Sequence, residues 1–355
     1  MIRFLKVTTR ILPLVLVACA NHPDVAETNF ATRWLALHLQ AEVQLIDQEF
    51  PVGVLNELAI SEESSLLLAD PQLGVVRVFS ATGEKIGYLQ ASESWEPLVV
   101  RTEPETASIY VCERGSRLWK FDGGVSRPAR LLGRFEKMLD FHLHPSGLII
   151  AMSCFDDGME IRTYRDGELV ASFLPSDERN VRLGKRTFAT VTVDPAGVIY
   201  ALQAYQPVVR KFNYKGEEVG AWEIRRNEYF RDFPDDAQNP FEVSRDWDFL
   251  ERWRRSFTSF RRIYWVPPNL VCVFQMNDPP ERPNVLDVYT TEGEYVGSAA
   301  TNEYLVGARG RRLYFTDFHV FPYGDCVVKI YELPEEVPVP PATRGESETK
   351  RKEKS

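Results

Sequence analysis

The side chains best suited to metal chemistry in this sequence are three acids, Glu57, Glu96 and Asp140, each near the start of an apolar stretch. Converging carboxylates are the ligands that Ca²⁺ prefers, and a bound dication can activate water for hydrolysis. The corresponding positions in the second half of the chain hold Thr190, Arg261 or Arg262, and Tyr304. Because basic side chains oppose a cation site, we expect no metal and no cofactor, with Ca²⁺ as the alternative.

Histidines offer a second candidate for metal binding. His142 and His144 are spaced as a ligand pair, but His144 occupies the turn position that Asp194 holds in VTVDPAG, which favours a turn role. The sequence contains no GxSxG, HExxH or CxxCH motif. No catalytic residue is therefore assigned, and a binding role is favoured over catalysis.

The elements that must position these residues are β-hairpins. VTVDPAGVIYAL (191–202) reads as two apolar strands around a tight turn, and it is followed by VVRKFNYKGEEVGAW (208–222), a second hairpin. Similar pairs recur along the chain. The turn glycines at positions 83, 123, 167 and 216 are 40, 44 and 49 residues apart. A four-stranded unit repeated at this spacing predicts an all-β fold, the β-propeller.

Five full units and a sixth that ends early indicate six blades, with seven as the alternative. The sixth unit lacks its outer strand, and residues 42–50 (EVQLIDQEF) can supply it. Pairing the two ends of the chain would remove exposed sheet edges. We therefore expect a propeller over residues 42–333, closed by its N-terminal strand, and a disordered, proline-rich tail over 334–355.

The phased hairpins of the VDPAGVIYAL…VRKFNYKGEEVGAW type resemble the NHL-type and TolB-like six-bladed propellers. The sequence looks most like the exported propeller lipoproteins of bacteria. Some six-bladed propellers hydrolyse lactones or esters with a channel-bound cation, so this resemblance implies a metal-dependent hydrolase as the alternative function. The likeness rests on repeat texture and covers about residues 42–333.

The N-terminus carries three basic residues, an apolar run and Cys19. The run is too short for a membrane-spanning helix, which predicts an export signal over residues 1–18. Leu16–Cys19 resembles the bacterial lipobox, so Cys19 is the expected lipidation site and 19–41 the tether; ordinary cleavage after Ala20 is the alternative. The expected location is the cell envelope, with attachment to the outer membrane or the periplasmic side favoured.

Charge excludes one class of partner. The chain has a formal charge of −9, and removal of the three basic residues in 1–18 leaves −12. Phosphate backbones need a basic face, so nucleic acid is excluded as the main partner. Contact with the membrane is expected through the lipid anchor only, and the protein is expected to be a monomer.

Long loops predict the face that binds. In a blade, the loop between strands two and three shares a face with the connections between blades, and the 34-residue insertion 225–258 is such a connection, between blades 4 and 5. Its helical spacing predicts either a capping helix or a lid that binds a partner. Expected contacts with a protein, peptide or glycan are Arg114, Tyr205, Trp247, Trp253, Arg254, Asp278, Phe318, His319 and Tyr323.

Overall fold

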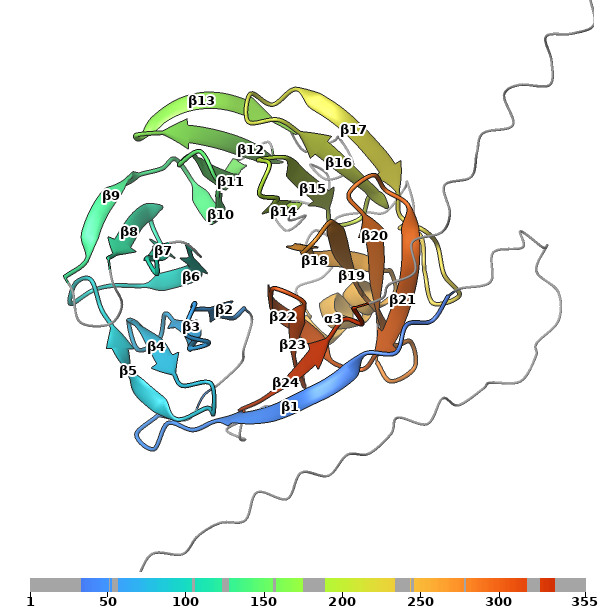
Figure 1. Ribbon diagram of the computed structural model, residues 1–355, viewed down its shortest axis with the longest axis horizontal. Helices are drawn as coiled ribbons and strands as arrows, with labels where there is room; N and C mark the ends of the chain where they lie inside the picture. Colours follow the sequence, from blue (N-terminus) through green and yellow to red (C-terminus); the bar gives the residue numbers. More distant parts are fainter. Residues whose placement is uncertain are drawn as a thin grey trace, which may run out of the picture. The chain divides into compact units, whose positions relative to one another are not determined.

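The chain divides into two units, Met1–Ala31 and Thr32–Ser355. The computed structural model describes residues of the second unit: 33–50, 52, 57–103, 106–122, 128–155, 158–174, 189–233, 243, 246–277, 279–317 and 326–335. Six four-stranded antiparallel sheets surround a common axis in these residues (Figure 1). This is the predicted β-propeller, and each sheet is one blade.

Blades 1 to 3 follow the chain from the inside outward. Their strands are β2 (Ala59–Ile60), β3 (Leu66–Asp70), β4 (Val75–Phe79) and β5 (Lys85–Leu89); β6 (Pro97–Thr102), β7 (Ile109–Glu113), β8 (Arg117–Phe121) and β9 (Arg130–Arg134); and β10 (Met138–Leu143), β11 (Ile149–Phe155), β12 (Gly158–Arg165) and β13 (Glu168–Phe173).

Blades 4 to 6 continue in the same order. Their strands are β14 (Ala189–Val193), β15 (Ile199–Gln203), β16 (Val208–Phe212) and β17 (Glu218–Glu223); β18 (Ser259–Val266), β19 (Leu270–Met276), β20 (Asn284–Thr290) and β21 (Tyr295–Thr301); and β22 (Tyr304–Arg309), β23 (Arg312–Thr316), β24 (Cys326–Glu332) and β1 (His38–Leu45).

The fourth strand of blade 6 comes from the other end of the chain. Strand β1 pairs antiparallel with β24, with Val43 opposite Val328. The strand begins at His38, inside the segment expected to be a tether. Figure 1 shows β1, in dark blue, running along the outside of the last blade as far as blade 1. Both ends of the propeller sequence are thus combined in one sheet, as the incomplete sixth repeat predicted.

The core lies between neighbouring blades. One cluster joins Leu202 and Val209 of blade 4 to Val271 and Val273 of blade 5, all fully buried. Strands in the middle of a blade have a neighbouring blade on each side, so their alternating side chains are buried on both faces, as in β19. The outermost strand β17 alternates between exposed and partly buried residues instead.

A histidine links the tight turns of two blades. His144 begins the turn between β10 and β11: its backbone N–H donates to Leu148 O (2.9 Å) and its carbonyl accepts from Gly147 N–H (2.8 Å). Its ring Nε2 lies 2.9 Å from the carbonyl oxygen of Gly197, in the corresponding turn of blade 4. The interpretation of His144 as a turn residue is confirmed.

The insertion between blades 4 and 5 is less helical than the sequence predicted. Within its described residues there is one helix, α3 (Trp247–Arg255), capped by the Asp246 carboxylate accepting from Asp248 N–H. Besides α3 and the helical residue Val243, the described remainder is a turn and irregular chain. No helix in the described residues is long and apolar enough to cross a bilayer.

Candidate functional site

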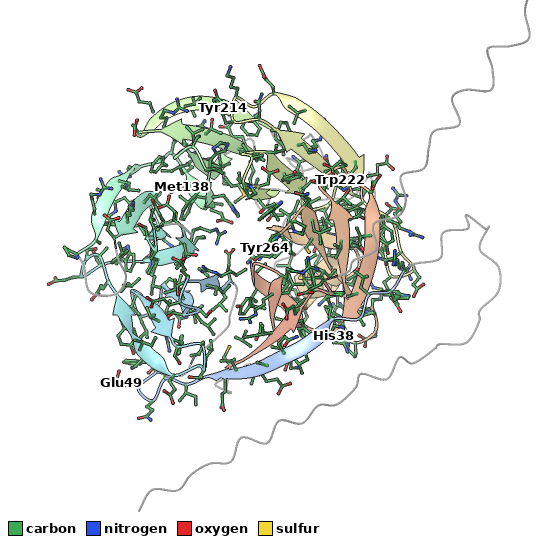
Figure 2. The ribbon with its side chains drawn as sticks, viewed as in Figure 1. His38, Glu49, Met138, Tyr214, Trp222 and Tyr264 are labelled. Atoms are coloured by element: carbon green, nitrogen blue, oxygen red, sulfur yellow. The ribbon has the colours of Figure 1, made fainter. Side chains whose placement is uncertain are left out.

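Side chains from the innermost strands of blades 2, 3 and 5, and from the residue Glu57 just before the innermost strand of blade 1, meet at the axis of the ring. We call them the axial cluster: Glu57, Arg101, Asp140, His142, Arg262 and Tyr264. Arg101 lies on β6, Asp140 and His142 on β10, and Arg262 and Tyr264 on β18. Figure 2 labels Tyr264 near the centre of the ring. The propeller thus places at one point residues that are 207 positions apart in the chain.

Arg101 holds the cluster together. Its Nη1 lies 2.7 Å from Glu57 Oε1, its Nη2 donates to Asp140 Oδ1 (2.7 Å) and its Nε donates to the carbonyl oxygen of Phe141 (3.0 Å). Arg262 Nη1 lies 3.8 Å from the other oxygen of Glu57. Blades 1 and 5 are not neighbours, so this last ion pair reaches across the axis. The four charged side chains are only 14 to 21% exposed.

The carboxyl groups of Glu57 and Asp140 differ in pKa, so Glu57 loses its proton at lower pH than Asp140 does. Burial raises the pKa of Glu57, but the positive charges of Arg101 and Arg262 outweigh it and leave the pKa below its ordinary value. Burial raises the pKa of Asp140 to about 6, assisted by the charge of Glu57 and opposed by the two arginines. Like charges that share a site commonly titrate in this split manner. Near neutral pH the cluster therefore approaches charge balance.

Replacing Asp140 with asparagine is expected to change how stability depends on pH. The folded protein holds the Asp140 proton up to about pH 6, whereas the unfolded chain releases it near the ordinary value of 3.8. Between these values the native state binds more protons, so the wild-type free energy of unfolding falls as pH rises. We expect Asp140→Asn to flatten this slope in urea titrations between pH 4 and 7. An unchanged slope would show that Asp140 is ionised throughout.

The acids proposed as metal ligands do not form a cation site. Glu57 and Asp140 come together, but both are held by Arg101, and a dication would have to displace that guanidinium. Glu96 lies elsewhere, on the surface, with its Oε2 3.1 Å from Arg114 Nε. Among the described residues, no three His, Cys, Asp or Glu side chains are grouped as metal ligands. The donor set therefore does not suit Ca²⁺.

The neutral members of the cluster add hydrogen-bonding groups to the axis. Burial, and then the charges of Arg101 and Arg262, lower the pKa of His142 well below its usual range, so its ring is uncharged. The Tyr264 hydroxyl is buried and has no hydrogen-bond partner among the described residues. Sequence reasoning missed Arg101, although an arginine inside the apolar run LVVRT was a detectable signal.

The predicted long-loop face exists, and backbone hydrogen bonds define it. Arg114 N–H, in the β7–β8 turn, donates to Glu96 O just before β6 (2.8 Å). Phe260 N–H, at the start of β18, donates to Ala204 O in the β15–β16 loop (2.7 Å). Loops between second and third strands therefore lie beside the connections between blades. This surface is called the long-loop face below.

The insertion is anchored on this face by an aromatic cluster. The Phe233 ring lies 4.4 Å from Tyr205, 5.6 Å from Trp253 and 5.0 Å from Phe257, measured between centroids. At its base, Thr258 N–H donates to Arg231 O (3.0 Å). Tyr205 and Trp253 thus pack the insertion against blade 4. That arrangement matches the capping alternative for the described part of the segment.

The remaining candidate contacts divide into two groups. Arg114 is 70% exposed on the long-loop face, where a partner could reach it. The side chains of Trp247 and Arg254, and the whole of Cys19, Asp278, Phe318, His319 and Tyr323, lie outside what the structure describes. Their assignments stay predictions. Among the described cysteines, Cys112, Cys272 and Cys326 are buried thiols outside any disulfide.

Neither a protein family nor a curated protein sequence matches the chain. Solved structures do. A member of the DUF4221 family from Bacteroides vulgatus superposes with a TM-score of 0.57 at 11% identity, covering 86% of this chain and 99% of the other. A Bacteroides fragilis protein described as exported gives 0.54 at 10% identity, over 85% and 96%. At such identities the likeness establishes the propeller fold alone.

Proposed function

We propose that this protein is an exported propeller, lipid-anchored at Cys19 in the bacterial cell envelope, which binds a protein, peptide or glycan through its long-loop face. The partner contacts the loops and the insertion, and the ring acts as a rigid support. The NHL-type and TolB-like likeness of the repeats supports this assignment, as does the description of a Bacteroides fragilis protein of similar fold as exported. A six-bladed propeller fold does not by itself imply a function, so the assignment depends on the residues of the proposed binding surface.

The observation that supports the proposal is that the two faces of the ring differ: one bears long loops and the insertion, and the other bears short turns. The long-loop face bears the insertion, held by Tyr205 and Phe233, and an exposed Arg114. On the opposite face, turns are short and held by neighbouring blades: His144 contacts Gly197 in the next blade, and Lys211 Nζ of β16 donates to Thr291 O in the β20–β21 turn (2.9 Å). Variable loops on a rigid scaffold are where binding proteins place their contacts. Of the two faces, the long-loop face is therefore the one on which a partner docks.

The axial cluster supports binding over hydrolysis. A hydrolase of the alternative kind needs carboxylates available to a cation or to water. Here Glu57 and Asp140 are both engaged by Arg101. The cluster therefore serves to join blades 1, 2, 3 and 5 across the axis, beneath the face that binds.

Binding is tested with purified full-length protein as bait in envelope extract. Two variants remove the proposed surface: Arg114→Glu, and a replacement of residues 232–257 by a short glycine–serine linker, which keeps the Arg231–Thr258 contact. We expect each variant to recover about tenfold less of the partner than the wild type does, as for the loss of a contact at the centre of an interface. The control is Lys215→Glu, an exposed charge reversal on the opposite face.

The binding proposal fails if every recovered partner is lost equally with Lys215→Glu, or is retained by both long-loop variants. Thermal unfolding of each variant establishes that the ring is folded. The anchor is tested in the same cells by fractionation. Membrane association that survives Cys19→Ser would contradict lipidation without bearing on the binding face.

A further inference from the structure

A short segment ahead of β1 adds a strand to the edge of blade 5. We call residues 33–37 the strap. Leu35 N–H donates to Ser298 O (2.6 Å), and Arg33 O accepts from Ser298 N–H (2.8 Å). Trp34 and Ser298 form a parallel bridge. Strand β21 is the outermost strand of its blade, so the strap pairs with backbone groups that would otherwise face solvent.

A valine–glycine pair in β21 makes room for the strap. A Cβ atom on Gly297 would lie 2.6 Å from Leu35 Cγ, closer than real side chains approach. The strap leucines, Leu35 and Leu37, pack against the core cluster that contains Val296, which is 0% exposed. The edge of blade 5 is therefore shaped to accept an extended segment with aliphatic side chains two residues apart.

Blade 4 carries the same pair at the same register. Gly297 lies opposite Val288 in blade 5, and Gly220 lies opposite Lys211 in blade 4. Each partner immediately precedes an aromatic residue, Tyr289 or Phe212, at or next to the end of the third strand. Val219 of blade 4 thus corresponds to Val296, but it is 55% exposed. Ala221 corresponds to Ser298, so its N–H and C=O point outward from the edge.

The described edges of blades 1 and 3 differ from that of blade 4. At the glycine position, β13 has Ala171, opposite Thr163. Blade 1 has a similar pair, Ile86, which is 57% exposed, and Gly87 opposite Val78. There the chain leaving β1 already pairs with the start of the edge, since Ile46 N–H donates to Gly83 O (2.9 Å). Blade 4 thus combines the valine–glycine pair and an exposed Val219 with an edge that, among the described residues, no other segment pairs with.

We propose that the outer edge of β17 is a second strand-addition site, which takes an extended peptide segment of a partner protein, parallel to β17. One residue of that segment accepts from Ala221 N–H, and the residue two positions later donates to Ala221 O. An aliphatic side chain covers Val219 and Gly220. Basic side chains suit its flanks, because Glu218 and Glu223 are exposed at the two ends of β17. This site is on the rim and does not depend on the long-loop face.

The probe is a synthetic, fluorescently labelled peptide with the sequence of residues 31–37 (ATRWLAL), titrated into the full chain and followed by anisotropy. We expect saturable binding. Val219→Lys places a charge on the edge, and Ala221→Pro removes the outward donor at a position where an edge strand tolerates proline. Each of these two substitutions should raise the dissociation constant of the peptide about tenfold or more, the effect expected from the loss of one favourable contact. Leu131→Lys, at a similarly exposed position on β9 (47% against 55% for Val219), should leave binding unchanged.

Absence of saturable binding overturns the proposal. So does binding that both blade 4 variants retain, because the peptide would then be exchanging with the strap on blade 5. Thermal unfolding monitors the fold of each variant. If Ala221→Pro does not fold, the exposed Val219→Lys substitution decides the outcome.

Discussion

Replacing Asp47 with asparagine is expected to lower the free energy of unfolding by on the order of 2 kcal/mol, because the carboxylate binds the closing segment of the ring to blade 1. Its Oδ1 accepts from Lys85 Nζ (2.9 Å), and its Oδ2 accepts from Tyr88 Oη (2.9 Å) and Arg77 Nη1 (3.3 Å). The Asp47 side chain is fully buried. Without its charge, Arg77 and Lys85 lose a partner inside the structure. Chemical denaturation at pH 7 measures the loss.

The same residue makes ring closure sensitive to acid. Burial raises the pKa of Asp47, but hydrogen bonds from Lys85, Tyr88 and the backbone N–H groups of Glu49 and Phe50 outweigh it and hold the pKa at about 2. The stabilisation is therefore complete above the unfolded value of about 3.8 and is lost as pH falls towards 2. We expect the difference between wild type and Asp47→Asn to shrink over that interval.

Glu49 provides the matched control. It also binds Lys85 (2.7 Å), but it is 65% exposed. Exposed ion pairs contribute little, so Glu49→Gln should leave the free energy of unfolding nearly unchanged. If the two variants were equally destabilised, the effect would belong to Lys85 and not to the burial of Asp47.

Replacing Gly83 with alanine is expected to destabilise the protein by about 3 kcal/mol, from backbone strain and overpacking together. Gly83 lies in the β4–β5 turn with φ +86°. An added Cβ would lie 2.0 Å from the carbonyl oxygen of Gln44 in β1 and 2.9 Å from Val43 Cγ1. The clash involves backbone, so a side-chain rotation cannot relieve it. The closing strand would have to move away from blade 1.

Gly167 separates strain from packing. It occupies the same turn of blade 3 with the same φ of +86°, and among the described residues nothing lies within 4 Å of its Cβ position. Gly167→Ala should cost about 1–2 kcal/mol from strain alone. The excess for Gly83→Ala, measured by urea denaturation, reports contact with β1. Equal costs would mean that β1 does not press on this turn in solution.

The hairpin repeat predicted much of the fold because local patterns encode it. An apolar strand, a turn glycine and an aromatic strand end recur in every blade, and each depends on near neighbours only. The incomplete sixth repeat also predicted that residues near the N-terminus complete the last sheet. Less was predictable for the insertion. Its apolar spacing suggested a helix that continues to Phe257, but α3 ends at Arg255, and Phe257 packs against Phe233 and Trp253 instead.

The sequence by itself determined the four-stranded blade and the number of repeats, since both follow from periodicity. It also predicts an export signal, from the composition of residues 1–18. Only the tertiary structure decided which charges meet at the axis. Glu57, Arg101 and Asp140 lie on three blades, and Arg262 reaches the first of them across the ring. Spacing along the chain carries no record of such contacts, because they depend on how blades twist and close. The sequence also contained no indication of the strap. The significance of the valine–glycine pairs became visible only because Val296 is covered in the structure while Val219 is exposed.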